Sequence, residues 1–376
     1  MDRIERGVIM LLLGVLASCS AAPLEDEVPA VPGLFHHPQD VVVVDGRVLV
    51  TNTAFHSETL SWGDGSVSVL DPESREVVTK LALSARNPQY MQVASEHVYV
   101  VSSGETVFQF DSGEVHSVSD GALDVFVRTD LDAGHLAFSV PLPRHPDDPT
   151  IGAPGSFVVL PDESAAYIGL GLSAHLYRVD LSTGALTRGP LNPIVARDHA
   201  GNDTLALAWH PDGHVLVVSY NSGELRRLDP ETDAWIGDPI DLSFTGDLEG
   251  PLDLVVMEDH VPDLYVVMSA ANTVTGWNSA EGLAGVSPAL FPVGPIANRI
   301  VASSDAVWVV NSGANTIIRH TLSDGVTSSA AIFAPGSNPW DMAIHSSASR
   351  GYVTLWATHQ VAEFDLVSGE VTWLLH

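Results

Sequence analysis

This sequence has little cysteine, little lysine and no long helical period. Each of these absences excludes a class of fold or partner. Cys19 is the single cysteine among 376 residues, so no internal disulfide can staple the chain. Lys80 is the single lysine, and 47 acidic residues against 16 basic ones give a net charge of −31. Such a surface repels phosphate backbones, which argues against nucleic acid as a partner. Without a long helical period, the 24 prolines and 31 glycines favour one large all-β domain.

The N-terminus has the layout of a bacterial export signal. Its apolar segment Val8–Ala17 suits a signal-peptide core and is too short to span a bilayer. The tetrapeptide LASC, which ends at Cys19, resembles a bacterial lipobox. The resemblance implies that residues 1–18 are removed and that Cys19 is lipidated; an ordinary cleavage site is the alternative. Ser20 in place of aspartate implies the outer membrane, and the acidic, proline-rich segment 19–36 is then an extended tether.

Seven related tetrapeptides repeat along the rest of the chain. Each fits the second of four short strands, and successive copies begin 43 to 68 residues apart. Four short strands at such a period are typical of β-propeller blades. We therefore predict an all-β fold over residues 37–376, a seven-bladed β-propeller with four antiparallel strands per blade. The tetrapeptides are LVTN (Leu49–Asn52), YVVS (Tyr99–Ser102), YIGL (Tyr167–Leu170), LVVS (Leu216–Ser219), YVVM (Tyr265–Met268), WVVN (Trp308–Asn311) and YVTL (Tyr352–Leu355).

The turn between the third and fourth strands has a spacing of its own. In blades 3 to 7 the third strand should end 13 residues after the tetrapeptide starts, and a turn residue, usually glycine, follows four residues later. The predicted strand ends are Asp180, Asp229, Asn278, Thr321 and Asp365, and the turn residues are Gly184, Asp233, Gly282, Gly325 and Gly369. Blade 2 offers Asp111 or Asp130 as its strand end. We choose Asp130, which makes residues 103–122 an insertion.

The tetrapeptides resemble the YVTN repeat of the YncE-like seven-bladed propellers, over roughly residues 37–376. The resemblance implies the architecture but no single activity, because such scaffolds carry lactonases, lyases, electron-transfer partners and binding proteins. Some YncE-like proteins are associated with DNA, yet this chain has no basic stripe. It also shows no strand shared between its two ends. Ring closure would then depend on blade 1 packing against blade 7, helped by Val31–Phe35.

Aligned positions at the starts of the first strands predict a ring at the mouth of the central channel. Three of its acidic residues flank Arg299, because blade 7 touches blade 1. Their carboxylates could hold Ca²⁺ or another divalent cation through oxygen ligands. The alternative, which we favour, is that Arg299 neutralises them. The ring positions are Asp40, Tyr90, Ser156, Thr204, Asp253, Arg299 and Asp341, and the candidate metal ligands are Asp40, Asp253 and Asp341.

Further candidates fall on the same face. The long loops 53–65, 103–122, 141–155 and 194–203 all follow second or fourth strands and so open onto the mouth. His199, beside Asp198, is the nearest counterpart of the mouth histidine that streptogramin-lyase-like propellers use with a divalent cation. The chain's 16 histidines include no HExxH pair, which gives a zinc site little support. The candidate ligand-binding residues are His37, Asn52, Tyr220, Asn311, Trp340 and Trp356.

Together these features predict a lipid-anchored protein of the bacterial cell envelope, at the outer membrane and facing the periplasm or the cell surface. Its mouth would bind a protein, a glycan or a small molecule. The alternative is a lactonase or lyase assisted by a divalent cation. The ring discriminates between them: carboxylates engaged by Arg299 favour the binding protein, and free carboxylates beside a histidine favour the enzyme.

Overall fold

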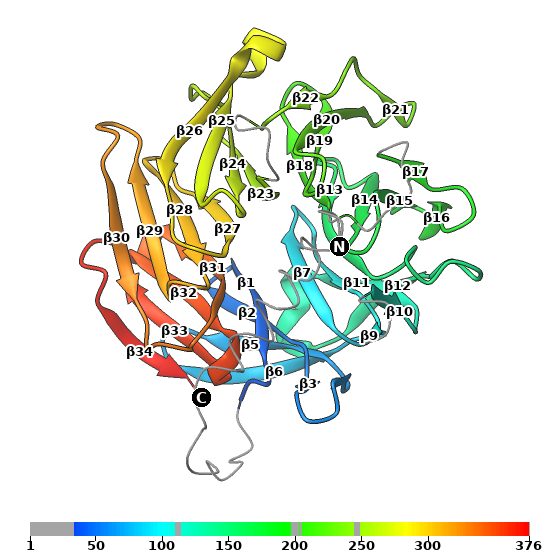
Figure 1. Cartoon of the computed structure of the whole chain (residues 1–376). Coiled ribbons are helices and arrows are strands. Elements are labelled where there is room, and N and C mark those ends of the chain that lie inside the picture. Colours follow the sequence, from blue (N-terminus) through cyan, green and yellow to red (C-terminus); the bar gives the residue numbers. More distant parts are fainter. Residues whose placement is uncertain (1–33, 110–113, 197–202, 204, 244–248, 376) are drawn as a thin grey trace.

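Seven sheets surround a central axis in the part of the protein that the structure describes (Figure 1). The computed structural model describes residues 34–109, 114–196, 203, 205–243 and 249–375. Each sheet pairs its strands antiparallel in the order of the chain, which confirms the predicted seven-bladed β-propeller. Cys19 and the predicted signal peptide lie outside the described residues. No helix within the described ranges is long and apolar enough to cross a membrane.

The strands of each blade run from the channel outward. Blade 1 contains β1 (Pro38–Val44), β2 (Arg47–Asn52), β5 (Ser66–Asp71) and β6 (Glu76–Ala82). Blade 2 contains β7 (Pro88–Val93), β8 (His97–Ser102), β11 (Gly121–Val127) and β12 (Leu136–Leu142). Blade 3 contains β13 (Pro154–Val159), β14 (Ala165–Leu170), β15 (His175–Asp180) and the outer pieces β16 (Ala185–Arg188) and β17 (Ile194–Val195). Blade 4 contains β18 (Leu205–His210), β19 (His214–Ser219), β20 (Glu224–Asp229) and the outer pieces β21 (Ala234–Trp235) and β22 (Ile240–Asp241).

The remaining blades follow the same plan. Blade 5 contains β23 (Pro251–Val256), β24 (Leu264–Met268), β25 (Thr273–Trp277) and β26 (Val286–Pro292). Blade 6 contains β27 (Ala297–Ala302), β28 (Ala306–Asn311), β29 (Thr316–Thr321) and β30 (Thr327–Ile332). Blade 7 contains β31 (Pro339–His345), β32 (Arg350–Leu355), β33 (Gln360–Asp365) and β34 (Val371–Leu375). Two hairpins, β3 (Phe55–His56) with β4 (Ser61–Trp62) and β9 (Thr106–Gln109) with β10 (Glu114–Ser117), are inserted, and short 3-10 helices are η1 (Arg128–Ala133), η2 (Ser279–Gly285), η3 (Ser346–Ala348) and η4 (Trp356–Thr358).

The second strands form the buried layer of every blade. All residues of β14, β19 and β28 are buried, because a neighbouring blade covers each face of these strands. The outermost strand β6 instead alternates between exposed and half-buried residues along most of its length. The cores lie between adjacent blades. Tyr99 and Leu123 of blade 2, for example, pack with Ile168 of blade 3.

A repeated corner precedes six of the first strands. The residue just before the strand has a positive φ, and its carbonyl accepts a hydrogen bond from the first residue after the tetrapeptide. The Thr53 amide donates to His37 at 3.2 Å, and the Ser103 amide donates to Asn87 at 2.9 Å. The corner therefore sets where each first strand, and with it each ring position, begins. The corner residues are His37, Asn87, Ala153, Gly250, Ile296 and Asn338.

The turn residues predicted for blades 3 to 7 all adopt a positive φ, including the non-glycine Asp233. Blade 2 differs in detail. Its third strand β11 ends at Val127, and η1 begins directly after it, so Asp130 lies within the turn instead of ending the strand. The chosen register still identified the correct segment. β11 pairs with β8, and the hairpin β9–β10 occupies the predicted insertion, while Asp111 lies outside the described residues.

The two ends of the propeller close the ring by packing, as predicted, and not by sharing a strand. β34 completes the sheet of blade 7, and β1 opens the sheet of blade 1. Phe35 and Val41 share a buried cluster with Tyr352 of blade 7. The Thr354 hydroxyl also donates to the carbonyl of Gln39 at 2.8 Å. Of the segment 31–35 that was expected to help, residues 31–33 lie outside the described residues.

Candidate functional site

Arg299 lies between the three acidic residues of the predicted ring. Its Nε is 3.1 Å from Asp341 Oδ1, and its Nη2 is 3.2 Å from Asp40 Oδ1. Its Nη1 is 3.7 Å from Asp253 Oδ1. The guanidinium carbon also lies 4.5 Å from the centre of the Tyr90 ring. First strands of five blades thus contribute one cation, three carboxyl groups and one aromatic ring to a single cluster.

The ring carboxylates also join neighbouring blades. Asp341 Oδ2 accepts a hydrogen bond from the Val41 amide at 3.0 Å, which links blade 7 to blade 1. Asp253 Oδ2 accepts one from the Ile300 amide at 2.9 Å, which links blade 5 to blade 6. Asp40 makes the same bond to blade 2. Each carboxylate therefore has a structural partner in addition to Arg299.

Burial controls the ionisation of the ring. It raises the pKa of Asp253 to about 6, although the nearby guanidinium opposes the shift. Burial and the neighbouring Asp341 carboxyl hold the pKa of Asp40 well above its usual range. Burial alone would lower the pKa of Arg299, but the three carboxyl groups hold it well above its usual value. A permanent cation thus occupies the place between the carboxylates. Within the described ranges, no group of three or more His, Cys, Asp or Glu residues is placed to hold a metal ion.

The remaining ring positions are uncharged. Burial raises the pKa of Tyr90 to about 12, so the phenol stays neutral. Ser156 Oγ accepts a hydrogen bond from the Leu207 amide at 3.1 Å, which repeats the link between blades. Thr204 lies outside the described residues. The register of β18 places Ala206, opposite Val218, at the ring position in blade 4.

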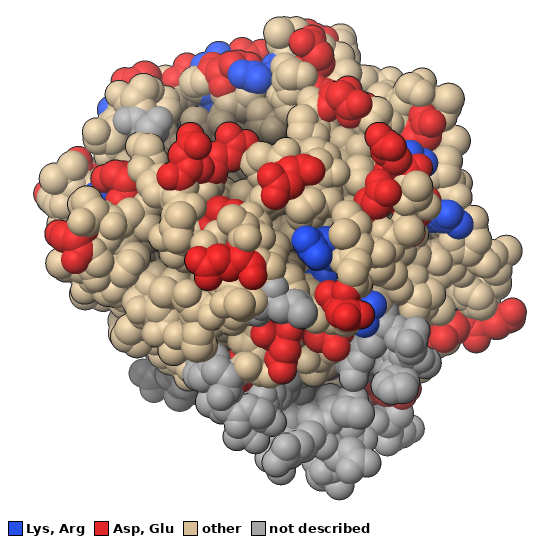
Figure 2. Space-filling model, turned by 90° about the horizontal axis from the view of Figure 1, so that it is seen from above, with Lys and Arg blue, Asp and Glu red and all other residues tan. Residues whose placement is uncertain are grey.

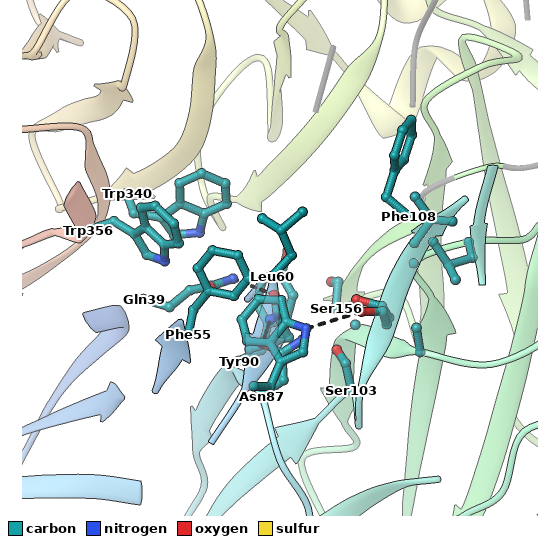
Figure 3. Close-up of a pocket in the computed structure, with 18 of the residues that line it drawn as sticks. Gln39, Phe55, Leu60, Asn87, Tyr90, Ser103, Phe108, Ser156, Trp340 and Trp356 are labelled. Atoms are coloured by element: carbon teal, nitrogen blue, oxygen red, sulfur yellow. Dashed lines mark hydrogen bonds between the residues drawn. The ribbon is translucent and has the colours of Figure 1, made fainter. Parts of the chain in front are cut away.

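A cavity of about 220 Å³ opens beside Tyr90 at the same end of the channel (Figure 3). The inserted hairpins form much of its wall: β3–β4 contributes Phe55 and Trp62, and β9–β10 contributes Phe108. Trp340 and Trp356 of blade 7 lie on the side of Phe55, and Phe108 lies on the opposite side (Figure 3). None of the described residues lining the cavity is charged. Two of the predicted long loops, 53–65 and 103–122, therefore meet at one aromatic cavity.

Three side-chain amides form a hydrogen-bonded chain along this cavity. Gln39 Nε2 donates to Gln89 Oε1, and Gln89 Nε2 donates to Asn87 Oδ1. Gln39 and Asn87 are only 5% and 3% exposed, and all three residues line the cavity. Among the described residues, the two end atoms of the chain, Gln39 Oε1 and Asn87 Nδ2, have no protein partner. The wall thus offers one hydrogen-bond acceptor and one donor to a bound molecule.

Three histidines, His36, His37 and His359, form a cluster that packs against the cavity residue Trp356. The His37 amide donates to His359 Nδ1 at 3.1 Å, and His37 Nδ1 donates to the Trp356 carbonyl at 3.0 Å. The rings of His37 and Trp356 are 4.2 Å apart. Burial, together with the nearby imidazoles of His359 and His36, lowers the pKa of His37 to about 3. Burial also lowers the pKa values of His359 and His36. The cluster is therefore neutral near pH 7, as packing against Trp356 requires.

Several other predicted binding residues serve the fold. Asn52 Nδ2 donates to Ser68 Oγ at 3.0 Å, and Asn311 Oδ1 accepts from the Gly294 amide at 2.9 Å. Tyr220 is buried and does not line the cavity. His199, the candidate catalytic histidine, lies outside the described residues.

The repeat alignment contained a signal for the amide chain that sequence reasoning missed. Gln39 and Gln89 each precede a ring position by one residue, so the same alignment places them side by side in blades 1 and 2. The third amide, Asn87, is the corner residue of blade 2. The aromatic residues of the two hairpins had no such signal, because each hairpin occurs in one blade alone.

The uncharged cavity contrasts with the outer surface. In the view of Figure 2, Asp and Glu side chains are spread over the face, and Lys and Arg form isolated spots among them. This distribution follows from the net charge of −31. The described cavity lining, in contrast, has no charged group.

Comparison with known proteins supports the fold. No protein-family model and no curated protein sequence matches the chain. A solved streptogramin B lyase superimposes with a TM-score of 0.64 and 13% identity, covering 87% of this chain and 93% of the lyase. Virginiamycin B lyase from Staphylococcus aureus gives a TM-score of 0.59 at 12% identity, covering 87% and 94%. A functionally unknown protein from Desulfotomaculum acetoxidans gives 0.57 at 14%, covering 82% and 92%. At these identities the likeness shows a shared β-propeller fold and not a shared activity.

Proposed function

We propose that this protein is a lipid-anchored binding protein of the bacterial cell envelope, and that it captures a small ligand in the aromatic cavity at its channel mouth. The observation that carries the proposal is the cavity itself: about 220 Å³, lined by aromatic side chains from blades 1, 2 and 7. Apolar cavities with a few polar groups are the usual form of small-molecule sites. The predicted lipidation of Cys19 supplies the anchor.

The ring supports binding over metal-assisted catalysis. A lactonase or lyase that uses a divalent cation needs carboxylates free to coordinate it. Here Arg299 approaches all three ring carboxylates within 3.7 Å, and backbone amides take further oxygens of Asp341 and Asp253. The lyase alternative is supported by the fold that this protein shares with two lyases, and proteins of this fold have many functions.

The tether reaches the propeller on the same face as the cavity. The carbonyl of His36 accepts a hydrogen bond from the Ala54 amide, at the start of the loop that carries Phe55. A lipid at Cys19 would therefore attach the propeller from its mouth side, through an extended tether of residues 19–36. Replacing Cys19 with Ser should move the protein from the membrane fraction to the soluble fraction. Unchanged membrane pelleting after a high-salt wash would contradict the anchor.

The binding role is tested with a small-molecule extract of bacterial envelopes. Purified wild type should retain compounds detectable by native mass spectrometry, and Trp340→Ala should lose them. Trp373→Ala is the matched control, because Trp373 is also half-buried in blade 7 but stacks on Arg75, away from the cavity. Equal retention by wild type and Trp340→Ala would contradict binding at the mouth. Divalent-cation-dependent consumption of streptogramin B would instead favour the lyase.

A further inference from the structure

The volume of the mouth cavity limits what it can hold. An apolar protein cavity of about 150 Å³ accommodates one benzene ring. The mouth cavity, at about 220 Å³, has room for two fused rings, and is small for a larger macrocycle or an extended peptide. A molecule of roughly ten heavy atoms therefore fits the space.

The lining selects an aromatic and uncharged molecule. Trp340, Trp356 and Phe55 lie on one side of the space and Phe108 on the other, so a flat ring in the cavity meets aromatic side chains (Figure 3). Among the described residues, Trp340 has no aromatic contact, so its half-buried ring face is available. An ion would lose its hydration without gaining a charged partner, because no described lining residue carries a charge. A sugar would likewise leave most of its hydroxyl groups unpaired on these walls.

The amide chain adds one polar requirement. The free ends, Gln39 Oε1 and Asn87 Nδ2, belong to residues that are almost fully buried. Gln39 Oε1 has no partner among the described residues, so a bound molecule that donates one hydroxyl or N–H hydrogen bond to it gains over one that does not. The ligand should therefore carry a single hydrogen-bonding group at the edge of its rings.

We propose that the mouth cavity binds a neutral two-ring aromatic molecule with one hydroxyl or N–H group, such as a naphthol or an indole. The proposal rests on the binding role proposed above and specifies its ligand class. Trp340 offers a ring face to the aromatic rings, and Gln39 Oε1 accepts a hydrogen bond from the hydroxyl or N–H group at the polar edge. No covalent step is involved.

The test uses 2-naphthol and naphthalene as a matched pair, with binding measured by ligand-observed NMR and calorimetry on the purified protein. Wild type should bind 2-naphthol about tenfold more tightly than naphthalene, because a single hydrogen bond in a buried site favours the hydroxyl compound. Trp340→Ala should weaken both ligands about tenfold, and Trp373→Ala should weaken neither. Gln39→Leu should remove the preference for 2-naphthol while retaining naphthalene. A purely structural effect would weaken both compounds equally, so this variant isolates the amide.

Aliphatic, sugar and anionic probes complete the design. Decanol, N-acetylglucosamine and benzoate should bind at least tenfold more weakly than 2-naphthol. Decanol binding as tightly as 2-naphthol, or no 2-naphthol binding at all, would overturn the proposal. If 2-naphthol does not bind but wild type still retains envelope compounds that Trp340→Ala loses, the proposed ligand class is wrong and the proposed binding role is supported. If 2-naphthol does not bind and no envelope compound is retained, the mouth is not a small-molecule site.

Discussion

The ring and the cavity lie next to each other at the channel mouth and differ in how their polar groups are satisfied. In the ring, one guanidinium serves three carboxylates, and backbone amides of neighbouring blades take further carboxylate oxygens. In the cavity, the amide chain ends in two atoms that have no protein partner among the described residues. A polar group whose partners are all within the protein contributes to the fold, whereas an unpartnered polar group that lines a cavity can bond to a ligand. We therefore assign a structural role to the charged ring and a binding role to the uncharged cavity.

The largest expected effect is on the ring. Arg299→Ala should lower the free energy of unfolding by about 3–5 kcal/mol, because it leaves buried carboxylates without their cation. Chemical denaturation measures the change. Arg86→Ala is the control: this exposed arginine pairs with Asp64 and Glu105 at the surface, so its loss should cost under about 1 kcal/mol. Equal effects of the two substitutions would mean that the ring is not a structural cluster.

The two tryptophans of the cavity should differ in stability although both line it. Trp356 is 3% exposed and packs on His37 and Phe55, so Trp356→Ala should cost about 3–5 kcal/mol of unfolding free energy. Trp340 is half-buried and lacks a ring partner among the described residues, so Trp340→Ala should cost about 1 kcal/mol. Thermal and denaturant unfolding of both variants compares them. Similar large losses would place Trp340 in the core and weaken its assignment as a ligand contact.

The histidines behind the wall predict a pH dependence. The pKa of His37 is lowered to about 3, so the unfolded chain takes up the proton first as pH falls below 6.5. Stability should therefore be full above pH 6.5 and decline toward pH 3, by about 2 kcal/mol between pH 6.5 and 5 from this residue. His37→Phe should remove this part of the decline, and His135→Asn, whose side chain is 80% exposed, should not. Denaturation curves at several pH values measure the difference. Parallel pH profiles for wild type and His37→Phe would contradict the shift.

The repeated parts of this molecule could be predicted from its sequence, and the unrepeated parts could not. The seven tetrapeptides and the spacing of the turn residues predicted the blades, because the strand spacing is similar from blade to blade. The same alignment placed Arg299 beside its three carboxylates. It failed where the local structure departs from the repeat: η1 moves Asp130 into a turn, and the register of β18 puts Ala206 at the ring position expected for Thr204.

The cavity could not be predicted from the repeat, because the contacts that form it do not recur from blade to blade. Its hairpins occur once each, and His359 joins His37 across the closure between blades 7 and 1, far away in the sequence. Asn52 and Asn311 looked like mouth residues because they end second strands, but their amides bond within the strand ends. A polar residue at a strand end can cap the backbone as readily as it can face a ligand, and only tertiary contacts separate the two roles.

The most direct test compares the two regions in one experiment, the melting temperature of the wild type titrated with calcium chloride and, separately, with 2-naphthol. A ligand that binds only the folded protein raises its melting temperature by mass action. We predict a rise with 2-naphthol and none with calcium, and a calcium-dependent rise only in Arg299→Ala, where the carboxylates are released. A calcium-dependent rise in the wild type without a response to 2-naphthol would contradict the account, because it would make the ring the binding site and leave the cavity without a ligand.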